Sequence, residues 1–230
     1  ILGETGEKMS KSRGNVVNPD DIVNEYGADT MRMYEMFMGD FEKAAPWSQS
    51  SIKGCKRFLD KIWNLQEIVV DGEEYSADLE VSFNKTIKKV TEDINNLGFN
   101  TAIAAMMALI NEIGAKKAIN KAEYRTLLVL LNPFAPHITE EIWENMGFGG
   151  QIAHTQWPTF DEAKCVEATV EVPVQINGKI RARINIAIDL SKDDMLAAAM
   201  ANDAIKAATE GKTVVKTICV PNKLVNIVVK

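Results

Sequence analysis

Cysteine and histidine are both scarce in this sequence of 230 residues, which contains three cysteines and two histidines. Cys55, Cys165 and Cys219 are isolated and widely spaced. An odd number of separated cysteines argues against a disulfide framework and against a paired-cysteine zinc site. We therefore expect these residues to be small core or surface side chains in a reducing compartment, and we expect no metal site.

Long apolar runs and a targeting segment are also missing. No run approaches the roughly 20 apolar residues that a membrane-spanning helix needs, and no basic segment followed by an apolar one opens the sequence. The first residue is Ile1 rather than methionine. We expect a soluble, cytoplasmic protein, and a chain that is a piece of a longer one.

An excess of positive charge is absent as well. The formal net charge is −6, which argues against indiscriminate nucleic-acid binding, so any such contact must come from local basic patches. Hydrophobic residues make up 46% of the sequence. This is enough apolar material to fill the core of one large domain or of two ordinary ones.

The run Lys8-Met9-Ser10-Lys11-Ser12 places two lysines three residues apart, among small hydroxyl side chains and shortly before Gly14. Such a segment can lie close to a polyanion and offer it two ammonium groups. On its own, a run of this kind is usually a solvated charged turn. The following residues favour a phosphate-binding loop, because Asn18 as N-cap and Pro19 at the first helical position predict a fixed helix directly behind it.

The stretch from Lys8 to Arg32, KMSKSRGNVVNPDDIVNEYGADTMR, resembles the second signature of class I aminoacyl-tRNA synthetases and is most similar to the leucyl-tRNA synthetase family. The resemblance implies an enzyme that uses ATP and Mg²⁺, in which the carboxylate of leucine attacks the α-phosphate of ATP and pyrophosphate leaves. It also implies that the lysines neutralise charge developing on the leaving group. Lys11 is expected to have the main catalytic role and Lys8 a supporting one. The expected ATP-binding residues are Lys8, Met9, Ser10, Lys11 and Ser12.

Apolar residues recur at spacings of three and four over most of the sequence up to residue 157, which predicts a series of helices. A helix is predicted over 28–38, after a stop at Gly27, and Ser48 is the predicted N-cap of a long helix. The buried stripe of the long helix is predicted at Ile52, Cys55, Phe58, Leu59, Ile62 and Trp63. A heptad seam is predicted at Phe83, Ile87, Val90, Ile94 and Leu97, and further helices over 103–113, 127–131 and 138–146. Such helices with short links form an antiparallel bundle.

Basic residues lie on the face of the long helix opposite its apolar stripe. Such a face is usually only solvated; contact with RNA is the alternative, and we nominate Lys53 and Arg57 for it. His137-Ile138 begins like the other class I signature, His-Ile-Gly-His, but the sequence then departs from it. We therefore expect His137 to be structural, in a corner between two helices, and we assign no chemistry to His154.

Towards the C-terminus the apolar period changes to two, which predicts strands over 170–176 and 180–188 with Asn177-Gly178 between them. A two-residue turn would place Ile176 opposite Lys179, and so set apolar and basic side chains on one face. Parity therefore predicts a three-residue turn with a left-handed Gly178 at a bulge. The residues expected to face inward are Ile180, Ala182 and Ile184, and those expected on the outer face are Arg181 and Arg183, beside Lys179.

Ser191 is the predicted N-cap of a helical segment that is broken near Asn202 and ends near Thr209. A second hairpin is predicted, with strands over 214–220 and 224–229. These elements form a small two-layer α+β domain that resembles the C-terminal domain of bacterial leucyl-tRNA synthetases. The resemblance implies contact with tRNA through a set of basic residues, Lys179, Arg181, Arg183, Lys216 and Lys223.

The predicted fold is mainly α, with an antiparallel helical bundle of the class I anticodon-binding type followed by a small α+β C-terminal domain. The predicted segments are the end of a catalytic core at 1–45, a tRNA-binding bundle at 46–157, a linker at 158–165 and the terminal domain at 166–230. The resemblance implies the C-terminal part of a monomeric leucyl-tRNA synthetase that binds tRNA(Leu). On its own this part is expected to bind no cofactor and to be inactive, because ATP and leucine would bind through a catalytic core that it lacks. The alternatives are a part of a valyl- or isoleucyl-tRNA synthetase, disfavoured by the terminal domain, and a non-catalytic tRNA-binding module.

Overall fold

The computed structural model describes residues 1–40, 43–166, 169–188 and 190–230. Residues 41–42, which fall in the predicted segment 1–45, and residues 167–168 and 189, in the predicted segment 166–230, lie outside the described residues. The chain divides into two compact units, Ile1–Cys165 and Val166–Lys230, and each unit has its own hydrophobic core. Within the described ranges, no helix is both long and apolar enough to cross a membrane.

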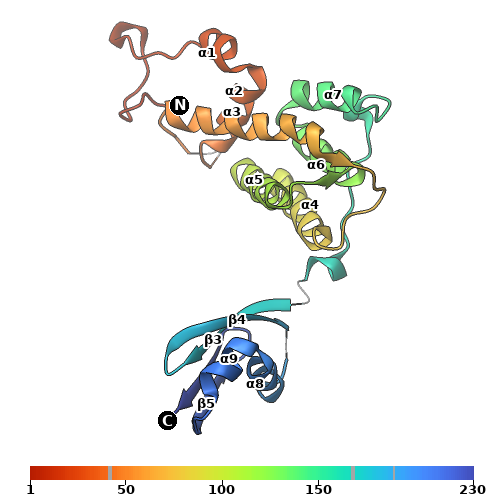
Figure 1. The fold of residues 1–230 in the computed structure, drawn as a ribbon. Helices are drawn as coiled ribbons and strands as arrows, with labels where there is room; N and C mark the ends of the chain where they lie inside the picture. The colour runs from red at the N-terminus through yellow and green to blue at the C-terminus, as the bar shows by residue number, and fades with distance from the viewer. Residues whose placement is uncertain (41–42, 167–168, 189) are drawn as a thin grey trace. The chain divides into compact units, whose positions relative to one another are not determined.

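The first unit is built from helices (Figure 1). Its α-helices are α1 (Pro19–Tyr26), α2 (Ala28–Phe37), α3 (Gln49–Asn64), α4 (Glu80–Asn95), α5 (Phe99–Lys116), α6 (Lys121–Leu131) and α7 (Pro136–Asn145). Its short elements are the 3-10 helices η1 (Lys11–Arg13), η2 (Leu65–Ile68), η3 (Ile152–His154) and η4 (Glu162–Cys165), and the parallel strand pair β1 (Val69–Val70) and β2 (Ile119–Asn120). Every helix predicted from the apolar spacing is present. The whole chain is mixed α/β, with 53% helix and 16% strand, so the predicted mainly α class describes the first unit alone.

Side-chain caps fix where these helices begin. Asn18 accepts a hydrogen bond from the backbone N–H of Asp20, with Pro19 at the first helical position of α1. Ser48 accepts one from the backbone N–H of Ser51 at the start of α3. Both N-caps predicted from the sequence are therefore confirmed, and each satisfies one of the backbone donors that a helix start leaves free.

Three details of the first unit differ from the predictions. Trp63, expected in the buried stripe of α3, is 41% exposed, and Leu97, expected in the seam of α4, is 52% exposed. The predicted seam extends the helical period past the real end of α4 at Asn95, and Leu97 has a left-handed backbone with φ of 58°. The segment 158–165, predicted as a linker, lies within the first unit, because Lys88 of α4 forms an ion pair with Glu162 of η4 at 2.8 Å.

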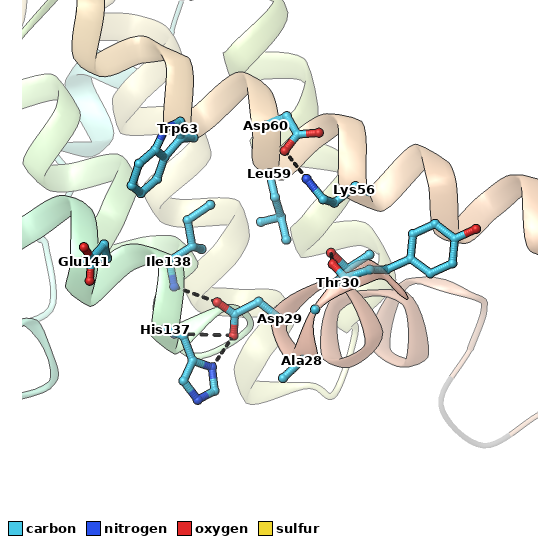
Figure 2. A pocket seen from close by; sticks show the side chains of 12 residues that line it. Ala28, Asp29, Thr30, Lys56, Leu59, Asp60, Trp63, His137, Ile138 and Glu141 are labelled. Carbon is cyan, nitrogen blue, oxygen red and sulfur yellow. Dashed lines mark hydrogen bonds and ion pairs between the residues drawn. The ribbon is translucent and has the colours of Figure 1, made fainter. Parts of the chain in front are cut away.

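Two side chains of α2, one helical turn apart, join this helix to the corner between α6 and α7. The carboxylate of Asp29 accepts a hydrogen bond from the backbone N–H of Ile138 at 2.7 Å (Figure 2). Arg32 donates to the carbonyls of Pro133 at 3.0 Å and Phe134 at 3.3 Å. The carboxylate thus meets the positive end of α7, and the guanidinium meets carbonyls that follow the end of α6. The corner predicted from the two prolines is confirmed, and it is where α2 docks.

The second unit has two layers, as predicted: a four-stranded sheet and two helices that cover one of its faces (Figure 1). Its elements are β3 (Thr169–Ile176), β4 (Lys179–Ala187), α8 (Lys192–Ala201), α9 (Asp203–Thr209), β5 (Val214–Val220) and β6 (Leu224–Val229). The strand order is β4-β3-β6-β5, with β3 and β6 parallel and the two hairpins antiparallel. The predicted cap at Ser191, break at Asn202 and second hairpin are all confirmed.

The predicted three-residue turn of the first hairpin is wrong. Ile176 pairs directly with Lys179, and the two residues between them, Asn177 and Gly178, have φ angles of 49° and 80°, as in the two-residue turns that favour Asn-Gly. The parity conflict is resolved further along, where the register shifts after Val174 and leaves one extra residue in β4. The bulge that the pattern required therefore exists, but it lies inside the strand and not in the turn.

The side chain of Asn177 extends the pairing between β3 and β6. It donates to the carbonyl of Val229 at 3.2 Å and accepts from the N–H of the same residue at 3.0 Å. We expect Asn177→Gly, which keeps the left-handed turn, to destabilise the second unit by about 1 to 2 kcal/mol through the loss of these bonds. Urea unfolding, together with faster hydrogen exchange at the Val229 amide, measures the effect. Asn222→Gly is the matched control, because Asn222 is also left-handed, with φ of 57°, and its side-chain oxygen has no hydrogen-bond partner among the described residues. Equal losses in the two variants would contradict the prediction.

Candidate phosphate-binding loop and basic surfaces

The base of the Lys8–Ser12 loop is tied to the segment that leads into α3. Leu2 pairs antiparallel with Lys8 and parallel with Pro46. The N–H of Leu2 donates to the carbonyl of Ala45 at 2.9 Å, and the N–H of Trp47 donates to the carbonyl of Leu2 at the same distance. The loop therefore leaves the protein from a fixed point beside the start of α3.

Inside the loop, apolar and cationic side chains are separated. Met9 is partly buried and packs against the core of the first unit, whereas Lys8 and Lys11 are exposed. Residues Lys11–Arg13 form a 3-10 turn that closes at Gly14, which is left-handed with φ of 66°. Among the described residues, neither lysine has an ion-pair partner. The loop thus holds two unpaired cations on an anchored backbone.

Asn15 closes the loop on itself. Its side-chain oxygen accepts from the N–H of Ser10 at 2.8 Å, and its amide nitrogen donates to the Glu7 carboxylate at 2.8 Å and to the Lys8 carbonyl at 3.3 Å. The hydroxyl of Thr5 and the amide of Asn15 both donate to Glu7 and lower the pKa of that carboxyl from 4.5 to about 2. Glu7 is therefore ionised throughout the neutral range, and the backbone N–H of Ser10, one of the residues expected to bind ATP, is engaged by Asn15.

Two of the basic residues of α3 lie along a hollow between α3 and α5. Lys53, Arg57 and Lys61 recur every four residues and so follow one side of the helix. Arg57 and Lys61 line a hollow of about 200 Å³, where Lys61 donates to the side chain of Asn111 at 3.2 Å. Lys53 and Arg57, the two residues nominated for RNA contact, are exposed, and neither has an ion-pair partner in the part of the chain that the structure describes.

The basic residues of the second unit are not equivalent. Lys179, Arg181, Lys216 and Lys223 are exposed, and within the described ranges none of them has an ion-pair partner. Arg183 is different, because its guanidinium forms an ion pair with a glutamate at 2.8 Å. Arg181 occupies the bulge of β4, as the extra residue between those that pair with Gln175 and Val174 of β3. The prediction that Arg181 and Arg183 act alike is therefore weakened.

The face of the second unit that α8 and α9 leave uncovered carries exposed aliphatic side chains beside these bases. Ile218 and Val220 alternate with Cys219, which packs against the inner core, so they lie on the opposite face. Ile180, predicted to face inward, pairs with the outward Gln175 and is 52% exposed. The register shift moved this residue from the core to the surface.

The structure also places the histidines and cysteines. The Nδ1 atom of His137 lies 2.7 Å from the Asp29 carboxylate, which confirms a structural position in the helix corner, and His154 lies in η3. All three cysteines are free. Cys55 is buried, and burial raises the pKa of its thiol to about 11, which makes it an unreactive core residue.

Some residues of the loop and the helix corner were not selected from the sequence. Asn15 directly follows Gly14, and this position next to a glycine was the only signal for it. Asp29 has its partners more than one hundred residues away along the chain, so no local pattern could have revealed it. Trp63 lines a pocket of about 400 Å³ with Asp29 and His137 (Figure 2), although its spacing indicated the core.

Two family models match this chain, one near its start and one over its middle. A model described as the anticodon-binding domain of tRNA ligase matches residues 78–196, which is more than half of the chain. The chain belongs to this family of tRNA ligases. A second model, described as tRNA synthetases class I (I, L, M and V), matches residues 1–48 and therefore contains the Lys8–Ser12 loop. The first match continues past Cys165, where the first unit ends, into α8.

Individual relatives are similar over the whole chain. A leucine–tRNA ligase from Alkaliphilus oremlandii (strain OhILAs) is 57% identical over 230 residues, which are 100% of this chain and 29% of that protein. A solved structure, the ternary complex of Agrobacterium radiobacter K84 agnB2 LeuRS with tRNA and LeuAMS, matches with a TM-score of 0.66 and 30% identity, over 100% of this chain and 32% of that one. The chain thus spans about a third or less of the length of these relatives.

Proposed function

We propose that this chain is the C-terminal part of a leucine–tRNA ligase, which joins leucine to tRNA(Leu) with the energy of ATP. The observation that carries the proposal is the anchored loop with two lysines that have no ion-pair partner among the described residues, in a chain that is 57% identical to a leucine–tRNA ligase throughout. This likeness favours leucine over the valine and isoleucine alternatives. The proposed segments are the end of the catalytic core at 1–45, the tRNA-binding bundle at 46–157 and the terminal tRNA-binding domain at 166–230, in a monomeric cytoplasmic enzyme.

In the proposed activation step, a carboxylate oxygen of leucine forms a bond to the α-phosphorus of ATP. The bond from that phosphorus to the bridging oxygen breaks, and its electron pair leaves with pyrophosphate. Negative charge therefore grows on the leaving phosphates, where Lys11 and Lys8 can stabilise it without reorganisation, because the loop that carries them is already anchored. These cations stabilise the transition state more than they stabilise bound leucine. Their loss should therefore lower kcat and leave leucine binding nearly unchanged.

The residues of the loop fit the phosphates of ATP, since they offer ammonium and hydroxyl groups, and Ser10 and Ser12 place their hydroxyls 3.2 Å apart. They do not form a cation site. In the part of the chain that the structure describes, no group of three or more His, Cys, Asp or Glu side chains is placed to hold a metal. No side chain among the described residues is therefore assigned to the Mg²⁺ expected for this chemistry, and Lys8 and Lys11 would act on the phosphates directly.

The partner proposed for the remaining basic residues is the phosphate backbone of tRNA. Lys53 and Arg57 line one side of α3, and Lys179, Arg181, Lys216 and Lys223 lie exposed on the second unit. In the part of the chain that the structure describes, each is an unpaired cation, in a protein with net charge −6, so binding RNA breaks no ion pair seen there. Contacts of this kind position an RNA and carry little sequence preference.

A salt titration of tRNA binding by the intact ligase tests this part. Arg181→Ala should flatten the slope of log affinity against log salt by about 0.7 to 0.9, as expected for one lost phosphate contact. Arg183→Ala, the matched control on the same strand, should change the slope by less, because Glu171 already neutralises that guanidinium. An unchanged slope of log affinity against log salt in Arg181→Ala would show that Arg181 is a solvated side chain that makes no phosphate contact.

A further inference from the structure

The side chain of Asn15 forms hydrogen bonds to the backbone on both sides of Met9, between the two lysines of the loop; we call this arrangement the bracket. Asn15 accepts from the N–H of Ser10 and donates to the carbonyl of Lys8, so it holds the peptide groups on both sides of Met9. Met9 itself is partly buried and packs against the core of the first unit. Lys8 belongs to the bracketed segment, and Lys11 opens the 3-10 turn that follows it.

A carboxylate fixes the bracket from the other side. Glu7 accepts from the Asn15 amide at 2.8 Å and reaches this position by lying against Gly3. A Cβ atom added at Gly3 would come within 2.0 Å of the Glu7 carboxylate oxygen, so a larger residue at position 3 would displace the Glu7 carboxylate from this position. The bracket thus has three parts: space at Gly3, the charge of Glu7 and the amide of Asn15.

We propose that Asn15 is a positioning residue for leucine activation, which holds Lys8 and Lys11 in the geometry that meets the leaving phosphates. This inference rests on the proposed function. An amide suits the position because it is a donor and an acceptor at once. An aspartate can still accept from Ser10, but it cannot donate to Glu7 or to the Lys8 carbonyl, and the two carboxylates would repel each other. Without these hydrogen bonds, the loop must adopt the productive geometry anew in each catalytic cycle. A displacement of the lysines by about 1 Å can cost on the order of 100-fold in rate.

The experiment uses the intact ligase and leucine-dependent exchange of pyrophosphate into ATP. Asn15→Asp should lower kcat about 10- to 100-fold with little change in the KM for leucine. Glu7→Gln alone should have a small effect, since its amide oxygen can still accept from Asn15. The double variant Glu7→Gln with Asn15→Asp restores a donor–acceptor pair of reversed direction between these two residues, but not the donor to the Lys8 carbonyl, so it should regain part of the lost kcat.

Asn18→Asp is the matched control for added charge. It makes the same chemical change three residues away, and aspartate serves as an N-cap as well as asparagine does. Equal losses of kcat in Asn15→Asp and Asn18→Asp would overturn the inference, and so would failure of the double variant to recover. A positioning role is separated from a general loss of structure because the melting temperature and leucine KM of Asn15→Asp should stay near those of the parent.

Lys11→Ala, measured in parallel, separates this inference from the proposed function. If Lys11→Ala lowers kcat and Asn15→Asp does not, the loop acts in activation without the bracket, and the inference alone is overturned. If Lys11→Ala leaves kcat unchanged, the proposed function of the loop fails, and the inference fails with it. Loss in both variants, with recovery in the double variant, supports both.

Discussion

Replacement of Lys11 by alanine in the intact ligase is expected to lower the rate of leucine activation by about 100- to 1,000-fold and to leave the affinity for leucine nearly unchanged. Lys11 is exposed, begins the 3-10 turn of the loop and, among the described residues, has no ion-pair partner. Its charge is therefore free to act on the developing charge of pyrophosphate. Single-turnover formation of leucyl adenylate, with leucine affinity determined separately, measures both parts of the prediction.

Arg13→Ala is the matched control for this experiment. Arg13 is an exposed cation at the other end of the same 3-10 turn, so the variant removes the same charge from the same loop. We expect only a small loss of rate from Arg13→Ala, and an intermediate one from Lys8→Ala. Equal losses for Lys11 and Arg13 would show that the loop acts through net charge alone. A defect confined to leucine binding would contradict the proposed role of Lys11.

The elements that follow one strong local pattern could be predicted closely from the sequence. The caps at Asn18, Ser48 and Ser191 and the second hairpin lie where the sequence indicates, because each depends on residues within one turn or one hairpin. The period alone could not say where a helix ends. Leu97 continues the spacing of α4, but the chain has already left the helix at Asn95, so the residue is exposed.

The first hairpin shows how a correct constraint can lead to a wrong geometry. Beyond the bulge, apolar residues do face apolar residues across β3 and β4, as parity requires, and one extra residue does absorb the mismatch. Asn177-Gly178 prefers the two-residue turn strongly enough that the extra residue moves to Arg181. The sequence contains both the preference for a two-residue turn and the preference for apolar pairing, but it does not show which one is stronger. The turn chosen by the chain leaves Ile180 exposed.

Contacts between distant segments could not be predicted at all. The loop was found because the lysines and the helix start are adjacent in sequence, whereas the roles of Glu7 and Asn15 depend on a fold-back of the chain over eight residues. The docking of α2 on the helix corner joins residues more than one hundred positions apart. In both cases an ordinary polar residue becomes important through a partner that no local period indicates.

The Asp29 contact leads to the second large expected effect. Helix α7 has Ala135 at its N-cap position, which offers no side-chain oxygen, and Pro136 at its first position. Asp29, in α2, supplies the missing acceptor to the N–H of Ile138, and it is only 8% exposed. A carboxylate at this end also complements the helix dipole. The cap of α7 therefore comes from another helix, and losing it should loosen both.

Asp29→Ala is expected to destabilise the first unit by about 2 to 4 kcal/mol, because the N–H groups at the start of α7 lose a charged acceptor in a largely buried site. Asp29→Asn should lower the free energy of unfolding by less than alanine does, but by more than a surface substitution does. Its single oxygen can accept from only one of the two backbone N–H groups, of His137 and Ile138, and its NH₂ group would face the other. Urea unfolding followed by tryptophan fluorescence is a suitable measurement, because Trp63 lines the same pocket as Asp29.

Glu141→Gln is the control, as Glu141 is an exposed carboxylate on α7 that lines this pocket and, in the part of the chain that the structure describes, accepts no hydrogen bond. Its removal should change the free energy of unfolding by no more than about 0.5 kcal/mol. If Asp29→Ala changed the free energy of unfolding by as little as this control, the Asp29 carboxylate would not act as a cap of α7. If instead alanine cost the most, asparagine less and the Glu141 control almost nothing, the order would identify a charged cap that α2 provides to α7.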